Sequence, residues 1–100
     1  MFRHTLFWSL KEPPDGQTKD AFIDLLTDRI YALKDKVEVI RAIQVGRNRA
    51  RVPNACDMAV LIDFDSWEDL LAFLDHPEHR KLADSVSEYR DAAYVVDFEF

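Results

Sequence analysis

The sequence lacks the features that mark several common classes of protein. Its 100 residues contain 13 Lys and Arg against 19 Asp and Glu, and the net charge of −6 argues against nucleic acid as a partner, because phosphate binding depends on a basic surface. No apolar stretch approaches the roughly 20 residues that a membrane-spanning helix needs. A single cysteine, Cys56, excludes an internal disulfide and is compatible with a reducing compartment. We therefore expect a soluble, cytoplasmic protein that binds neither nucleic acid nor a membrane.

Repeats, low-complexity tracts and linkers are also absent, so we expect residues 1–100 to form one domain. The composition, with 48% hydrophobic and 32% charged residues, is ordinary for a globular protein. A domain of this length buries only roughly 60–70% of the surface that its unfolded chain exposes. A second source of burial would therefore help this chain to fold.

The spacing of apolar residues predicts the element order β-α-β-β-α-β. Residues 2–10 alternate in the manner of a strand, and further strands are predicted at 39–46, 56–64 and 92–100. The turn sequence Pro13-Pro14-Asp15-Gly16 follows the first strand and leads into a helix that ends near Lys36. Paired helices are predicted from residue 66 to about residue 89. The first helix is expected to bury an apolar stripe made of Phe22, Leu25, Leu26, Ile30 and Leu33.

This order is typical of an α+β, ferredoxin-like fold, in which a four-stranded antiparallel sheet carries its helices on one face. The predicted strands are apolar on both faces, so one apolar face has no cover within the chain. We expect this uncovered face to include Leu6, Met58, Val60 and Val95. Because an apolar patch of that extent is normally buried by a partner, we expect a homodimer that packs sheet against sheet.

Residues 58–62 form the longest uninterrupted apolar run, which is typical of a strand that is covered on both faces. Asp63-Phe64-Asp65-Ser66 ends this run. Ser66 is a typical helix N-cap, and Asp69 three residues later completes something close to a capping box. A helix with one apolar face is therefore expected to begin directly after Ser66.

The motif His76-Pro77-Glu78-His79 predicts a break between two helices. Pro77 disfavours helical backbone at His76 and suits the first turn of a new helix, so one helix should end there and another begin at once. His79 then lies in the first turn of the second helix, one helical step from the apolar residues Leu82, Ala83 and Val86. An ionisable side chain on a buried face is a candidate functional group.

These segments together resemble a known family. The motifs that carry the resemblance occur in the same order over nearly the whole chain: Phe2-Arg3-His4, Val45-Gly46-Arg47-Asn48, Asp63-Phe64-Asp65-Ser66, His76-Pro77-Glu78-His79 and Val95-Val96-Asp97-Phe98. They resemble the stress-responsive dimeric α/β-barrel (Dabb) domains. This resemblance implies the ferredoxin-like fold just described, with the sheets of two protomers forming a dimeric α/β barrel between them.

The resemblance also implies a role for one histidine. Olivetolic acid cyclase, a relative that closes a polyketide by aldol chemistry, uses a histidine at the position of His79. It pairs this histidine with a tyrosine where the present chain has Phe73, and it has a further histidine where this chain has Met58. The resemblance therefore implies a general base at His79 without the hydroxyl and the second imidazole of the cyclase.

His79 is the main candidate for a catalytic residue. Burial and the start of a helix both disfavour an imidazolium, so its pKa should lie below the ordinary value of about 6.5. The alternative is a core histidine that bonds to a backbone carbonyl. His4 and Asp97 are further candidates on the face expected to line the barrel, where a contact between them would orient an imidazole or serve the structure alone. Three residues are expected to line a substrate cavity: Trp8, Met58 and Phe73.

No metal and no cofactor is predicted. His76 and His79 are three residues apart, but the sequence offers no evident third ligand. The arginine-rich stretch at residues 47–51 could attract an anionic substrate, although a solvated hairpin loop is the simpler interpretation.

Two functions fit these patterns. The first is a cofactor-independent lyase, cyclase or isomerase that acts on a small apolar carbonyl compound in the barrel cavity, with His79 as the base and with His4 and Asp97 orienting it or the substrate. The second is a non-catalytic, stress-related dimeric module that provides stability or binds a ligand, with structural histidines. An oxygenase built on a related dimeric barrel would share the fold alone.

Overall fold

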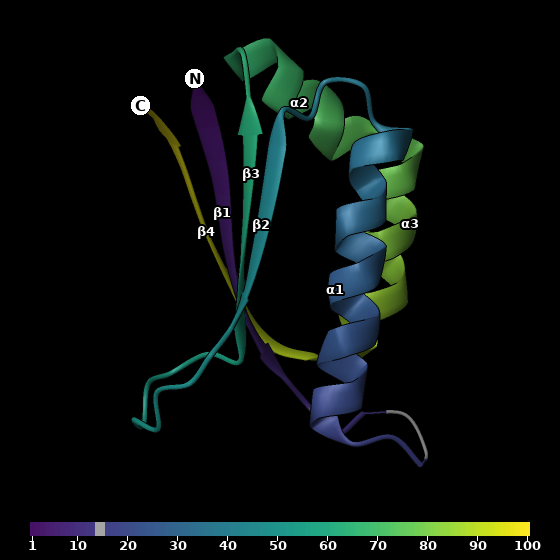
Figure 1. Cartoon of the computed structure of the whole chain (residues 1–100), viewed down its shortest axis with the longest axis vertical. Helices are drawn as coiled ribbons and strands as arrows, with labels where there is room; N and C mark the ends of the chain where they lie inside the picture. Colours follow the sequence, from purple (N-terminus) through teal and green to yellow (C-terminus); the bar gives the residue numbers. More distant parts are fainter. Residues whose placement is uncertain (14–15) are drawn as a thin grey trace.

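The computed structural model describes residues 1–13 and 16–100 and shows a four-stranded sheet with its helices on one side (Figure 1). Neighbouring strands are antiparallel in the spatial order β2-β3-β1-β4, which confirms the predicted α+β, ferredoxin-like fold. Part of the predicted turn at residues 13–16, namely residues 14 and 15, lies outside the described residues. The elements in chain order are β1 (Phe2–Leu10), α1 (Lys19–Lys36), β2 (Ala42–Arg47), β3 (Met58–Phe64), α2 (Trp67–Asp75), α3 (Pro77–Val86), the 3₁₀ turn η1 (Ser87–Tyr89) and β4 (Arg90–Glu99).

The predicted local signals at the helix ends are present. The Ser66 hydroxyl accepts a hydrogen bond from the Asp69 backbone N–H at 3.1 Å and so caps α2. The backbone of His76 is extended, as the following Pro77 requires, and α3 begins at that proline. The ring nitrogen Nδ1 of His76 accepts from the Glu78 backbone N–H at 3.1 Å, so this histidine caps α3.

Two sequence predictions about α1 and β2 need correction. Leu25 is exposed, because the buried row of α1 runs at spacings of three and four through Ile23, Leu26, Ile30 and Leu33, and Leu25 lies beside that row. Strand β2 begins at Ala42 rather than at residue 39, because the preceding segment forms a turn in which the Ile40 N–H donates to the Val37 carbonyl. Both turn residues are buried in the core.

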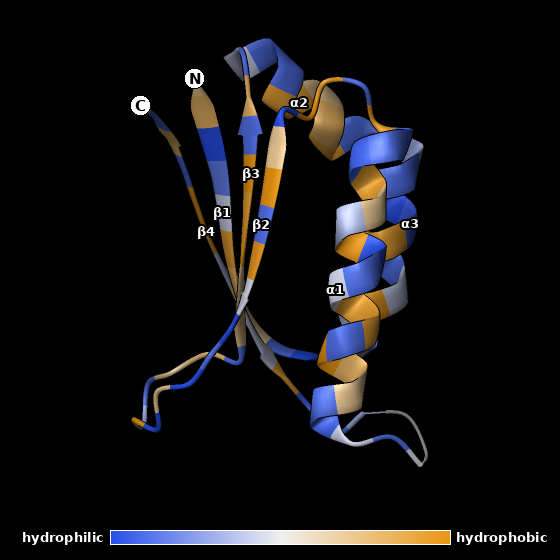
Figure 2. Cartoon of the chain, viewed as in Figure 1, coloured by the Kyte–Doolittle hydropathy of each residue, from blue (hydrophilic) through white to orange (hydrophobic). Residues whose placement is uncertain are grey.

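The hydrophobic core lies between the sheet and the helices, and Figure 2 shows hydrophobic residues in all four strands. Buried and half-buried residues alternate along β3, and the buried set includes Met58 and Val60, each 2% exposed. The prediction that Leu6, Met58 and Val60 form an uncovered face is therefore wrong, because their side of the sheet faces the helices. Val95 lies opposite Leu6 and so on the same side, although it is exposed at the edge strand β4. We call this side the inner face.

The opposite side of the sheet, which we call the outer face, carries the uncovered apolar residues. Arg3, Thr5 and Phe7 alternate with the inner residues of β1 and pair with Phe98, Val96 and Tyr94 of β4. The exposed fraction is 37% for Phe7, 61% for Tyr94, 55% for Val96 and 40% for Phe98. A bidentate ion pair between Arg3 and Asp63, at 2.7 and 3.0 Å, lies on the same face. An apolar face without cover is thus present, made of residues other than those predicted.

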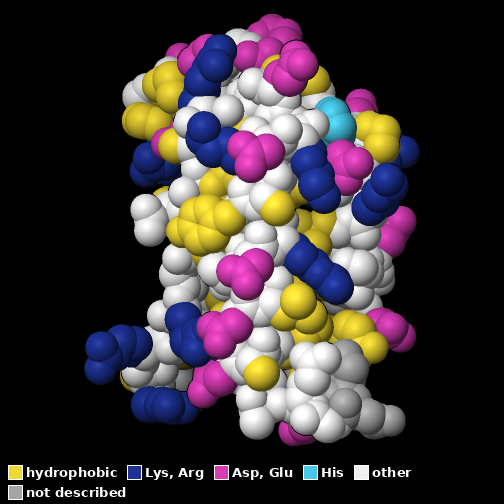
Figure 3. Space-filling model, turned by 45° about the vertical axis from the view of Figure 1, so that its right-hand side comes forward, with side chains coloured by type: hydrophobic (Ala, Val, Ile, Leu, Met, Phe, Trp, Pro, Cys, Tyr) yellow, Lys and Arg dark blue, Asp and Glu magenta, His cyan; other side chains and the backbone are white. Residues whose placement is uncertain are grey.

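The helical side of the molecule has a different surface. Figure 3 shows Lys and Arg side chains mixed with Asp and Glu over this side, with hydrophobic side chains between them. Such a mixed surface is normal for a solvated helical layer. Within the described residues, no helix combines the length and the apolar character that crossing a membrane requires.

Candidate active site

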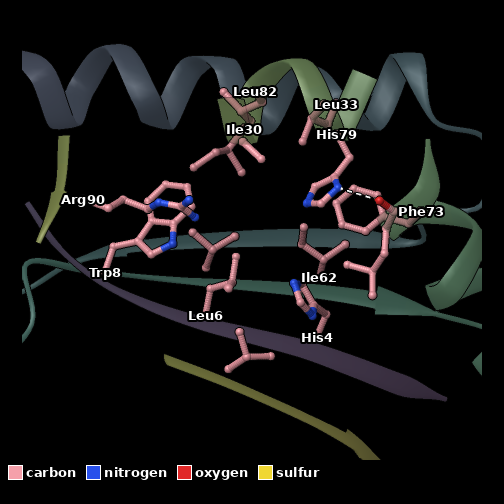
Figure 4. A pocket seen from close by; sticks show the side chains of 14 residues that line it. His4, Leu6, Trp8, Ile30, Leu33, Ile62, Phe73, His79, Leu82 and Arg90 are labelled. Atoms are coloured by element: carbon pink, nitrogen blue, oxygen red, sulfur yellow. Dashed lines mark hydrogen bonds between the residues drawn. The ribbon is translucent and has the colours of Figure 1, made fainter. Parts of the chain in front are cut away.

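A cavity of about 210 Å³ lies between the inner face of the sheet and the helices (Figure 4). Most of its wall is apolar, and the polar exceptions are His4, Trp8, His79 and Arg90. His4 and His79 lie toward one end in Figure 4, and Trp8 and Arg90 lie toward the other, with Leu6 between them. An apolar cavity with a few convergent polar groups is the usual form of a small-molecule site.

His79 is held in the first turn of α3 with a defined ring orientation. Its Nδ1 lies 3.0 Å from the Leu74 carbonyl oxygen. Since a carbonyl oxygen only accepts, Nδ1 carries the proton, and in the neutral ring Nε2 is left with a free lone pair. Figure 4 shows this second nitrogen pointing into the cavity. The ring is therefore arranged to accept a proton from a molecule bound there.

The surroundings of His79 favour its neutral form. Burial has the largest effect and lowers the pKa of His79 from its ordinary value, as predicted. The hydrogen bond to the Leu74 carbonyl opposes this shift. The electrostatic interaction with His4 and the positive charges of Arg80 and Arg90 lower the pKa of His79 further. A neutral imidazole near pH 7 is the form that a general base needs.

His4 and Asp97 face each other across β1 and β4, and the anticipated contact between them is present. His4 Nδ1 lies 2.5 Å from Asp97 Oδ1, which fixes the proton on Nδ1 and leaves Nε2 free. The His4 ring is buried, and Figure 4 shows its free nitrogen on the cavity side. The expected location of this pair on the face that lines the dimer barrel is wrong, because both residues lie on the inner face, toward the helices.

The three residues predicted to line a cavity have different positions. Phe73 of α2 contacts both histidines, with ring centroids 6.0 Å from His4 and 4.6 Å from His79. Trp8 lies at the other end of the cavity. Met58 is not part of the cavity wall but is buried in the core, where its backbone pairs with that of Trp8. Phe73 and Trp8 therefore belong to the candidate site, and Met58 does not.

Sequence reasoning missed Arg90, which joins Trp8 in the cavity wall. Simple alternation from Asp97, Val95 and Ala93 would place residue 91 on the inner face and residue 90 on the outer face. The β1–β4 register shifts between Ser9 and Leu10, so that Leu10 pairs with Arg90. An irregularity of this kind moves one residue to the other face, and no local sequence signal announces it.

No metal centre is apparent: the described parts of the chain contain no cluster of three or more His, Cys, Asp or Glu able to hold an ion. His76 and His79 have different tasks. The first caps the start of α3, whereas the second bonds to Leu74 and faces the cavity.

Solved structures of similar fold cover almost the whole chain. A dimeric protein of unknown function with a ferredoxin-like fold, from Bacteroides fragilis NCTC 9343, is 26% identical, with a TM-score of 0.78 over 99% of this chain and 95% of that chain. A dimeric ferredoxin-like protein of unknown function from Thermobifida fusca YX is 20% identical, with a TM-score of 0.80 over 99% and 90%. A hydroxynitrile lyase from Passiflora edulis is 17% identical, with a TM-score of 0.80 over 97% and 90%. The last two likenesses establish the fold alone.

The comparison with sequence families is more specific. No curated protein matches the chain. Residues 2–100, which are nearly the entire sequence, match the profile of the Stress responsive A/B Barrel Domain (Dabb). The match agrees with the motifs around His4, Ser66, His79 and Asp97 and with the ferredoxin-like topology. The chain is therefore a member of the stress-responsive A/B barrel domain (Dabb) family.

Proposed function

We propose that the protein is a homodimer that catalyses cofactor-independent acid/base chemistry on a small apolar carbonyl compound, as a lyase, a cyclase or an isomerase. One observation carries the proposal: the unprotonated Nε2 of His79 opens into an apolar cavity of about 210 Å³. A cavity of about 150 Å³ holds benzene. The substrate is therefore about the size of a benzene ring with a short side chain.

His79 would act as the general base in this reaction. Its Nε2 removes a proton from the carbon beside the substrate carbonyl, while Nδ1–H keeps its hydrogen bond to Leu74. His4, held by Asp97, orients the substrate or exchanges a proton with it through its free Nε2. The apolar wall, with Phe73 against both imidazoles, limits the access of water.

The outer face supports the homodimer. Phe7, Tyr94, Val96 and Phe98 form an exposed apolar surface on one side of the sheet, and the Thr5 hydroxyl beneath it has no hydrogen-bond partner among the described residues. A second copy packed sheet against sheet would cover this surface. The relatives from Bacteroides fragilis and Thermobifida fusca are described as dimeric, which is consistent with this arrangement.

A non-catalytic, ligand-binding dimer is the second candidate function. The hydrogen bond from His79 to the Leu74 carbonyl favours it, because that bond is also what a purely structural histidine would make. Phe73 favours it too, since it provides no hydroxyl beside the imidazole. In this case the cavity would bind an apolar compound and release it unchanged.

An exchange assay separates the two functions without knowledge of the natural substrate. Small apolar ketones are incubated with the protein in D₂O, and NMR follows deuterium incorporation beside the carbonyl. The wild-type protein should accelerate exchange, and His79→Asn should lose about 100- to 10,000-fold of that acceleration. Asparagine keeps an N–H donor for the Leu74 carbonyl, so the fold should persist.

His76→Asn is the matched control. Asparagine is a good N-cap, so the start of α3 and the cavity stay intact and the exchange rate should remain that of the wild type. Two results would contradict catalysis by His79: no acceleration by the wild type with ketones that bind in the cavity, or equal acceleration by His79→Asn. A drop of several degrees in the melting temperature of His79→Asn would favour the structural role.

A further inference from the structure

The end of the cavity away from His79 contains a buried hydrogen-bond donor without a protein partner. Trp8 is only 5% exposed, and its Nε1–H has no acceptor among the described residues. Figure 4 shows the indole nitrogen on the side of the ring that faces the middle of the cavity. Buried donors of this kind are rarely left unpaired in folded proteins. The Trp8 N–H is therefore placed to donate to a bound molecule.

Arg90 lies beside this donor, and it too has no anionic partner among the residues that the structure describes. Its guanidinium carbon is 5.8 Å from the centroid of the Trp8 ring, and its side chain lines the same cavity. Within residues 1–13 and 16–100, no carboxylate forms an ion pair with Arg90. Four other arginines do pair with aspartates: Arg3, Arg41, Arg47 and Arg80.

Arg90 differs in its surroundings from the surface arginines that form no ion pair with a described residue. Arg29, Arg49 and Arg51 also form no ion pair with a described residue, but they are exposed, and water solvates them. Arg90 is half-buried beside an apolar wall, where a cation gains more from an anion than it does in open solvent. Its contact with the Trp8 ring face leaves the N–H donors of both side chains available.

We propose that the ligand of this cavity is an apolar carboxylate, whose carboxylate group is bound by the Arg90 guanidinium and the Trp8 Nε1–H. Arginine matches the planar geometry of a carboxylate, and one cation with one neutral donor suits a single negative charge. The apolar body of the ligand then lies along Leu6, toward the histidines at the other end. The identity of the substrate rests in addition on the proposed acid/base function: if that function holds, the substrate is a small apolar oxo acid. Its carbonyl lies at His79 and its carboxylate at Arg90.

The test compares two probes of the same shape, 3-phenylpropanoate and the neutral 3-phenylpropanamide. Binding is followed by ¹⁵N NMR of the full-length protein, which has one indole N–H from Trp8 and one from Trp67. Trp67 is exposed and is not part of the cavity wall, so its signal is an internal control. The carboxylate should bind about tenfold more tightly than the amide, as one charge-assisted hydrogen bond predicts, and should shift the Trp8 signal alone.

Two arginine variants show whether Arg90 is responsible. Arg90→Gln should abolish the preference for the carboxylate, whereas Arg80→Gln should keep it, because Arg80 is exposed and pairs with Asp75. The proposal is overturned if the two probes bind the wild type equally, if neither binds, or if Arg90→Gln retains the preference. It is also overturned if the Trp8 signal does not respond to the carboxylate.

The same measurement keeps this inference separate from the proposed catalysis. Carboxylate binding is read in His79→Asn as well as in the wild type, because the imidazole does not contact the carboxylate group. A preference for the carboxylate in His79→Asn supports the binding mode even when the exchange assay finds no catalysis. If deuterium exchange depends on His79 but the two probes bind equally, the carboxylate site is refuted, while the proposal that His79 is a general base stands.

Discussion

The two faces of the sheet have opposite chemistry. The inner face is covered by helices and nevertheless holds buried polar side chains, among them His4 and the Trp8 indole. The outer face has no cover among the described residues and nevertheless exposes apolar side chains, among them Tyr94 and Val96. On the inner face the buried Trp8 N–H has no acceptor among the described residues, and on the outer face large apolar side chains are exposed.

The largest expected effect comes from placing a charge on either side of β3. Val60→Asp puts an unpaired carboxylate in the core, at a cost of about 4 kcal/mol or more, which is comparable with the whole stability of many small domains. This variant should be unfolded at every protein concentration. Leu61→Asp changes the neighbouring residue on the outer face, where the charge stays solvated in a single chain, so this variant should still fold. Circular dichroism melts at two concentrations provide the check.

Equal behaviour of these two variants would contradict the assignment of faces. If Leu61→Asp also unfolded at all concentrations, the outer face would have to be part of a core within one chain. If Val60→Asp melted like the wild type, the inner face would not be the buried one.

The next effect concerns the partner on the outer face. Val96→Glu introduces a charge at the centre of the exposed apolar surface and should weaken the dimer by about 100-fold or more, because the charge is desolvated in both copies. Leu71→Glu on α2 is the control, since Leu71 is also exposed but belongs to the helical side. Sedimentation equilibrium at micromolar concentration measures both. A folded wild-type monomer there, or equal weakening by both variants, would reject sheet-to-sheet packing.

Features that depend on near neighbours in the sequence could be predicted. The cap at Ser66 and the helix break at Pro77 each depend on residues within three or four positions, so β3, α2 and α3 follow from local chemistry. The position of His79 on the apolar side of α3 follows in the same way, and so does the direction of its pKa shift.

Features that depend on which face of the sheet the helices cover could not be predicted from neighbouring residues in the sequence. The period of two in a strand separates Val60 from Leu61 but does not tell which of them the helices cover, so the inner and outer faces were exchanged. The cavity consequently lies within a single chain, between its sheet and its helices. Arg90 was missed for a related reason, since only the shifted register after Ser9 brings its side chain to the inner face.

A smaller effect should appear in the pH dependence of stability. Burial lowers the pKa of His79 in the folded state below the unfolded value of about 6.5, so the unfolded chain binds the extra proton first. The free energy of unfolding should therefore fall as the pH decreases through about 6.5 toward the folded-state pKa, and this contribution should be constant above that window. His79→Asn should flatten this part of the profile, whereas His76→Asn should keep it. Urea melts between about pH 5 and pH 8, at one protein concentration, measure the slope.

The smallest expected effect is a change in the pKa of His79, which distinguishes the charge of Arg90 in the cavity from the charge of Arg80 on the surface. Arg80 and Arg90 both lower the pKa of His79 through their positive charge, so Arg80→Gln and Arg90→Gln should each raise it. Arg80 is exposed, and about 0.5 M salt should screen its effect, whereas Arg90 acts across an apolar cavity and should keep its effect. NMR titration of the His79 ring in low and high salt gives the comparison. If salt removes both shifts equally, the Arg90 guanidinium is solvated like a surface group, and the electrostatic argument for a carboxylate ligand in the cavity fails with it.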